Sequence, residues 1–88
     1  MKITLKEQEC EGNYKFNGQI FYTRGMESMF GENVFLIIFQ TMSQIKQLVE
    51  EGIADYFQVV TVEYNSISQD IWCIDNIDHI IFLLPQEY

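Results

Sequence analysis

The chain has 88 residues, with 13 acidic against 5 basic side chains and a formal net charge of −8. Hydrophobic residues make up 48% of it, which excludes a disordered acidic tail, because such tails lack the apolar groups that offset the entropy of ordering. The acidic excess argues against direct binding to nucleic acid or an anionic membrane, since both select for clusters of Lys and Arg. We expect one domain over residues 1–88, with roughly 5,400 Å² of folded surface.

The N-terminal quarter of the chain predicts a β-hairpin. Residues 2–9 alternate imperfectly between apolar and polar side chains, which is typical of a half-buried strand. Glu11-Gly12-Asn13 is a turn signal, because Gly and Asn both tolerate positive φ. A second strand follows within residues 14–23, either with a bulge at Asn17-Gly18 or confined to residues 19–23.

Residues 32–51 predict a long helix that faces the core. Its apolar side chains recur at spacings of three and four, and neighbouring apolar residues widen the stripe; the first group is Val34, Ile38, Met42, Ile45 and Val49, and the second is Phe35, Phe39 and Leu48. Gly52 fits the end of the helix, because the residue after a helix often adopts a left-handed conformation.

The C-terminal part of the chain predicts three strands. Residues 56–64 carry apolar groups on both faces, as a central strand does, and residues 65–68 form a turn. Residues 70–75 and 77–84 follow as further strands. The order β-β-α-β-β-β predicts an α+β fold, an antiparallel sheet with one long helix packed on one face.

Carboxylates gather at three places and are the candidate partner-binding residues. In an extended strand, Glu7, Glu9 and Glu11 would project from one face about 6.6 to 7 Å apart, roughly two steps of the charge spacing along one DNA strand. Such rows are also typical of solvated faces that keep a small protein in solution. The candidate contacts are Glu7, Glu9, Glu11, Glu50, Glu51, Asp55, Asp75 and Asp78, with Tyr56 or Tyr88 as aromatic anchors.

No catalytic constellation is evident, and we expect no enzyme activity, cofactor or bound metal. Asp75 and Asp78 are better explained as solvated loop acids than as an acid–base pair. Zinc is the alternative to a metal-free fold, because Cys10, Cys73 and His79 are soft ligands that a carboxylate would complete. Their spacing lacks the close cysteine pairs of structural zinc sites, so buried, unreactive thiols are the default interpretation.

The segments FYTRGMES and DYFQVVTVE resemble a small family of bacterial proteins in which a Y-x-T-R-G strand end precedes a helix and a D-Y-[LF]-Q-V strand. The resemblance covers Phe21 to Glu63 and implies an α+β fold in a protein of bacterial genomes and mobile elements. The chain departs from the pattern before this range and after Asn65. The family has no assigned activity, so the likeness bears on fold. Within it, Arg24 pairs with a carboxylate of this chain or with an acidic group of a partner; we favour the internal pair.

In type, the chain also resembles the small acidic inhibitors, including anti-CRISPR proteins, that phages and mobile elements direct against host nucleic-acid-binding machinery. The resemblance implies a protein in the cytoplasm of the bacterial host cell that covers the basic DNA-binding surface of a CRISPR-Cas nuclease, as a DNA mimic. No apolar run is long enough to span a membrane, and no signal sequence is evident. The alternative is a structural or housekeeping interaction module, for example a homodimer formed through an apolar edge at Ile80 to Leu84.

Overall fold

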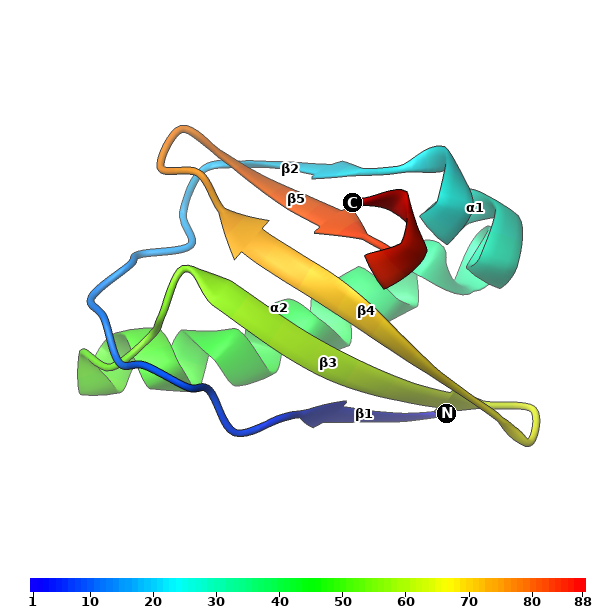
Figure 1. Ribbon diagram of the computed structural model, residues 1–88, viewed down its shortest axis with the longest axis horizontal. Coiled ribbons are helices and arrows are strands. Elements are labelled where there is room, and N and C mark those ends of the chain that lie inside the picture. The colour runs from blue at the N-terminus through cyan, green and yellow to red at the C-terminus, as the bar shows by residue number, and fades with distance from the viewer.

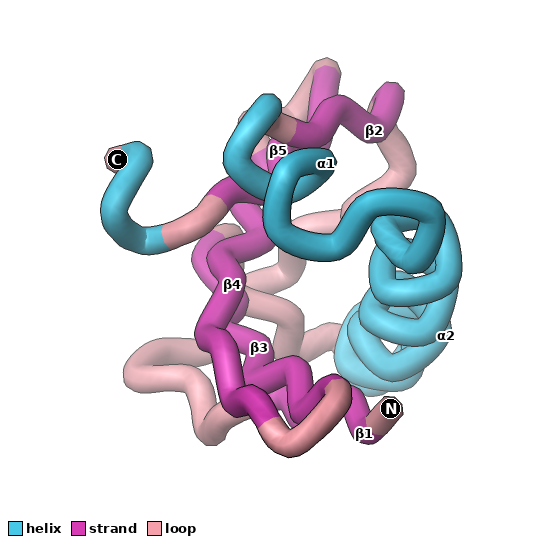
Figure 2. Tube along the Cα trace, turned by 90° about the vertical axis from the view of Figure 1, so that its right-hand side faces the viewer, coloured by secondary structure: helices cyan, strands magenta, loops and turns pink.

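The computed structural model describes residues 1–88 as one five-stranded sheet with its two α-helices on one face (Figures 1 and 2). Its accessible surface of 5614 Å² is close to the value expected from chain length. No helix has both the length and the apolar character needed to cross a membrane. The elements in chain order are β1 (Lys2–Leu5), β2 (Gln19–Tyr22), α1 (Arg24–Phe30), a 3₁₀ turn (Gly31–Asn33), α2 (Val34–Glu51), β3 (Phe57–Tyr64), β4 (Ile67–Asp75), β5 (His79–Leu83) and a second 3₁₀ turn (Pro85–Glu87).

The α+β class is confirmed, but the predicted N-terminal hairpin is wrong. The strands lie in the order β1-β3-β4-β5-β2, so β1 and β2 form opposite edges of the sheet (Figure 1). All neighbouring pairs are antiparallel except β2 and β5, which are parallel. β5 is therefore an interior strand, and its residues Ile80, Phe82 and Leu83 are buried. The homodimer edge expected at Ile80 to Leu84 does not exist, because β2 covers it.

The first strand ends at Leu5 because the chain beyond it bonds to another part of the molecule. The Gln8 side chain donates to the Ile53 carbonyl (2.6 Å) and accepts from the Asp55 N–H (3.1 Å). The Tyr14 N–H then donates to the Ala54 carbonyl (3.0 Å). Residues 6–18 consequently cross one end of the molecule instead of turning back beside β1 (Figure 1).

The later strands follow their sequence pattern. β3 lies between β1 and β4, and its Val60 and Val62 are fully buried while Phe57 and Val59 stay partly exposed on the other face. The β3–β4 connection is tighter than the predicted four-residue turn. Its two central residues, Asn65 and Ser66, both have positive φ (48° and 65°), which matches the right-handed twist of a hairpin.

The long helix is confirmed, but its buried face differs from the expected stripe. Val34, Ile38 and Ile45 are buried as predicted, and Gly52 ends α2 with φ 73° and its N–H toward the Leu48 and Val49 carbonyls. The rings of Phe35 and Phe39 are 65% and 70% exposed instead of widening the core. The sheet-facing positions beside the stripe are taken by Ile37 and Thr41, both fully buried.

A short helix precedes α2 where the sequence predicts only a loop, and the C-terminus holds it. The Thr23 hydroxyl accepts from the Met26 N–H as the N-cap of α1 and donates to Glu87 (2.6 Å). The same carboxylate accepts from the N–H groups of Gly25 (3.1 Å) and Leu84 (2.8 Å). A Cβ on Gly25 would overlap the Glu87 carboxylate, so a larger residue there would displace this side chain from its hydrogen bonds.

Arg24 does not form the expected internal ion pair. It is the first residue of α1 and is exposed. The charged contacts of the chain are Lys6 with Asp70 and, when the imidazole is protonated, His79 with Asp78. The carboxylate that does reach this turn, Glu87, bonds to neutral donors.

Replacing Glu87 by glutamine should weaken the fold at neutral pH and have no effect in acid. Hydrogen bonds from the Thr23 hydroxyl and the Leu84 and Gly25 N–H groups hold the pKa of Glu87 below its usual range. Because the folded-state pKa is lowered, the stabilisation is present above the unfolded pKa of about 4.3 and is lost as the pH falls through the folded value. Because Glu87 is exposed, solvent screening limits the loss in the free energy of unfolding to about 0.5 to 1 kcal/mol at pH 7. Urea denaturation at neutral and acid pH measures this change in the free energy of unfolding, with Glu63→Gln at an exposed position as the control. Equal losses of stability at both pH values would contradict the prediction.

Candidate interaction site at the acidic end

The first acidic row lies on an irregular segment and not on a strand. Glu7 and Glu9 are exposed within residues 6–18, which follow β1. The regular spacing expected for an extended strand therefore does not apply. Instead, the Gln8 bonds bring the segment against residues 53–58, where Gln8 also accepts from the Gln58 amide (2.7 Å). Glu7 and Glu9 consequently share a hollow of about 540 Å³ with Asp55.

The second acidic cluster joins the first at this end of the molecule. Glu7 and Glu11 line another hollow together with Leu48, from the last turn of α2, and Ile53. Figure 1 shows the 6–18 connection passing beside the C-terminus of α2. Two clusters that are about 40 residues apart in the chain thus form one surface. We call this surface the acidic end. Glu7, Glu9, Glu11 and Asp55 line its two hollows. Glu50 and Glu51 are exposed in the last turn of α2, which begins at Leu48, and Glu50 also lines a groove with Lys15 and Lys46.

The electrostatics of the acidic end favour a cationic partner. The C-terminus of α2 adds the negative end of a helix dipole to the carboxylates. Lys6 is adjacent to Glu7 in the chain, but its ammonium pairs with Asp70 (2.8 Å), and this hydrogen bond lowers the pKa of the Asp70 carboxyl. The closest cation in the sequence is therefore already engaged by a carboxylate outside the acidic end.

Asp75 belongs to the interior and not to the predicted contact surface. It is only 4% exposed, and its two oxygens accept hydrogen bonds from the backbone N–H groups of Phe16 (2.9 Å) and Ile77 (2.8 Å). The interpretation of Asp75 as a solvated loop acid is therefore wrong. Asp78, three residues later, is exposed as expected and lies 2.8 Å from Nδ1 of His79.

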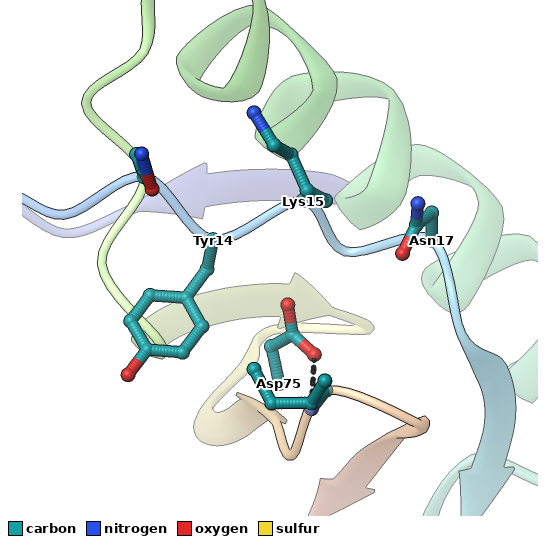
Figure 3. Close-up of a pocket in the computed structure, with 6 residues that line it drawn as sticks. Tyr14, Lys15, Asn17 and Asp75 are labelled. Carbon is teal, nitrogen blue, oxygen red and sulfur yellow. Dashed lines mark hydrogen bonds between the residues drawn. The ribbon is translucent and has the colours of Figure 1, made fainter.

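The Asp75 carboxylate holds two strained residues across a small pocket. Phe16 (φ 48°) and Ile77 (φ 76°) both adopt left-handed conformations that non-glycine residues rarely take, and each donates its N–H to this carboxylate. Figure 3 shows Tyr14, Lys15 and Asn17 of the 6–18 segment around Asp75, with the bond from Ile77 dashed. The pocket is about 350 Å³ in volume. Asp75 thus joins the segment that carries part of the acidic end to the β4–β5 turn.

An aromatic pair borders the acidic end. Tyr56, one of the two predicted anchors, lines the hollow with Glu7 and Glu9, is half exposed, and packs its ring 5.7 Å from that of Tyr14. The other predicted anchor, Tyr88, packs 5.3 Å from Trp72 on the sheet face opposite α2. Of the two, Tyr56 is the one placed to contact a partner together with the carboxylates.

The structure does not bring the zinc candidates together. Cys73 is fully buried in the core, Cys10 is exposed on the 6–18 segment, and His79 begins β5 on the opposite sheet face from Cys73. No group of three or more His, Cys, Asp or Glu side chains is arranged to hold a metal ion. The zinc alternative therefore finds no site among these residues.

The two thiols should differ sharply in reactivity. Burial, with a smaller contribution from the nearby Asp75 charge, raises the pKa of the Cys73 thiol far above its usual range, while Cys10 is exposed. Because the thiolate is the reactive form, an aromatic disulfide reagent should titrate one thiol of the native protein quickly and the second only on unfolding. Cys10→Ser should remove the fast phase. A fast phase that survives this substitution would contradict the assignment.

Comparison with protein-family models, with curated protein sequences and with solved structures finds no match to this chain.

Proposed function

We propose that this chain is a non-enzymatic acidic protein that binds the basic, DNA-binding surface of a nucleic-acid-binding effector and blocks it. The observation that supports the proposal is the acidic end, where Glu7 and Glu9 share a hollow with Asp55, and Glu7 and Glu11 line another beside the last turn of α2. A carboxylate cluster of this kind complements the Lys and Arg side chains that neutralise phosphates in a DNA-binding groove.

The surface offers more than charge. Tyr56 and Phe57 line the same hollow as Glu7 and Glu9, so a partner would meet an aromatic centre beside carboxylates. In protein interfaces, aromatic side chains near the centre usually supply much of the affinity. Charged side chains at the rim speed association and orient the partners. Binding should consequently weaken as salt screens the carboxylates.

An RNA-guided DNA nuclease is the most concrete effector, because it must expose a positively charged channel to hold its heteroduplex. On this proposal, the chain is encoded by a phage or mobile element whose bacterial host carries such a nuclease. Asp78 extends the candidate surface toward the β4–β5 turn, whereas Asp75 is excluded from it by burial.

The test is a binding and cleavage experiment. The tagged protein is used to recover partners from bacterial cells that express an RNA-guided nuclease, and the purified protein is then added to a DNA-cleavage reaction at rising salt. The proposal expects the nuclease among the recovered proteins and inhibition that weakens with salt. Unchanged cleavage together with failure to recover any nucleic-acid-binding protein would overturn it.

A further inference from the structure

The outward side of α2 is an apolar surface without charge over the stretch from Val34 to Ile45. From Val34 to Ile45 the helix carries no charged residue, although the chain has a net charge of −8. Phe35 and Phe39 expose 65% and 70% of their surface there, and Leu36 is also exposed. Figure 2 shows α2 at the outside of the molecule. A surface helix normally presents charged or polar residues on this side, so the α2 face has the character of an interface.

The apolar surface extends beyond the helix. The ring of Phe35 packs edge-on against Tyr22 of the edge strand β2, with centroids 5.6 Å apart. Phe39, Met42 and Val49 line a groove of about 590 Å³. The charged Lys46 and Glu50 of the same helix and residues 15–17 of the preceding segment complete its lining. The groove can accept an aromatic ring of a molecule packed against α2.

We propose that a second copy of this chain occupies the α2 face, in a twofold dimer whose two α2 helices pack antiparallel and cross near Phe39. In such a pair, a residue a given number of positions before Phe39 faces the residue the same number after it on the other copy. Glu32 and Lys46 stand seven residues on either side of Phe39, and both are exposed. Each copy would therefore place its Glu32 opposite the other copy's Lys46, forming two ion pairs at the ends of an apolar centre.

Charge also favours the α2 face for a second copy. Two copies at −8 each repel wherever their carboxylates meet, and the stretch of α2 from Val34 to Ile45 carries none, since Glu32 and Glu50 lie beyond its two ends. Glu32 lies in the 3₁₀ turn that leads into α2, and Lys46 lies in the second half of the helix. Both pairs therefore form together only if the helices cross at a shallow angle of about 20°. The complementarity thus commits the dimer to one geometry.

The exposed area points to a weak dimer. Burying an aromatic side chain removes 150–250 Å² from water, so Phe35, Phe39 and Leu36 together offer on the order of 300 Å² per copy. A standard interface takes about 800 Å² per partner, so the exposed apolar area of the α2 face supplies less than half of one. We therefore expect a dissociation constant in the micromolar range.

Sedimentation equilibrium of the purified chain, from about 1 μM to about 500 μM, tests the dimer without any effector, so its outcome is independent of the proposed function. A monomer–dimer equilibrium is expected, and Phe39→Asp should raise its dissociation constant at least about 100-fold, because each dimer loses two central rings and gains two charges. Ile67→Asp is the matched control, a similarly exposed apolar residue at the start of β4. Both variants change exposed residues, and circular dichroism confirms that they fold.

A charge swap tests the geometry. Glu32→Lys and Lys46→Glu should each weaken the dimer about five- to tenfold at low salt, since each puts like charges face to face, and the double variant should restore it. A chain that stays monomeric over the whole range, or a dimer that Phe39→Asp leaves unchanged, overturns the proposal. A dimer that the double variant fails to restore overturns the antiparallel arrangement.

Discussion

Replacing Asp75 by alanine is expected to lower the free energy of unfolding by about 3 kcal/mol, the cost of leaving buried donors unpaired. The carboxylate is the acceptor for the N–H groups of both Phe16 and Ile77. Phe16 is itself buried in the core, so without Asp75 its N–H has no hydrogen-bond partner. The left-handed conformation of Phe16 would also lose the bond that stabilises it. Residues 6–18 should then detach from the β4–β5 turn.

Urea denaturation followed by the fluorescence of Trp72 measures the effect, and Asp78→Ala provides the matched control. Asp78 is in the same turn but exposed, so its loss should change stability by less than about 0.5 kcal/mol. The stability loss of Asp75→Asn should lie between those of Asp75→Ala and Asp78→Ala, because the amide keeps one acceptor oxygen. An unchanged midpoint for Asp75→Ala would show that the buried carboxylate does not hold the segment.

Local patterns predicted the elements whose partners are close in the chain. The period of α2, its stop at Gly52 and the two-faced composition of β3 all follow from neighbouring residues, and each is confirmed. Periodicity could not decide which side of α2 faces the sheet, because residues 34–39 are all apolar. Burial of Ile37, and exposure of Phe35 and Phe39, depend on what the sheet presents to the helix.

Long-range contacts account for what the sequence could not predict. β2 pairs with β5 from 60 residues away, in parallel, although the local turn signal at residues 11–13 favoured a hairpin with β1. Similarly, an aspartate before a turn often accepts a hydrogen bond from the N–H two residues later, which predicts the bond from Ile77 to Asp75. The residues next to Asp75 in the sequence give no indication of the bond from Phe16. The acidic clusters were each recognisable, whereas their union depends on Gln8, which reaches residues 53–58.

The two proposed surfaces are compatible in space. The acidic end lies at the C-terminus of α2, and the proposed dimer pairs these helices antiparallel about Phe39. The two acidic ends would then point in opposite directions, with the helix C-termini about 36 Å apart at 1.5 Å per residue. A dimer could engage two basic surfaces at once, and the Phe39→Asp monomer would retain a single acidic end. Inhibition that survives in this monomer shows that one acidic end suffices.

Reversing charge at the acidic end should have the largest effect on partner binding. The double variant Glu7→Lys with Glu9→Lys changes the net charge from −8 to −4, since each reversal adds two units. Both side chains are exposed on an irregular segment and accept no hydrogen bond that the fold needs, so stability should be retained. Affinity for the effector should fall at least about 100-fold at low salt, because close charge pairs across an interface are each worth about 1.5 kcal/mol or more.

The control is a variant of equal net charge, Glu27→Lys with Glu63→Lys, which alters exposed acids outside the acidic end. Binding kinetics measured at two salt concentrations separate local from global charge. If the acidic end is the contact, the control should slow association only a few-fold, through reduced steering, while the Glu7 and Glu9 variant also dissociates faster. Equal losses in both variants would show that the partner senses only net charge, and that the gathering of these carboxylates beside α2 has no role in recognition.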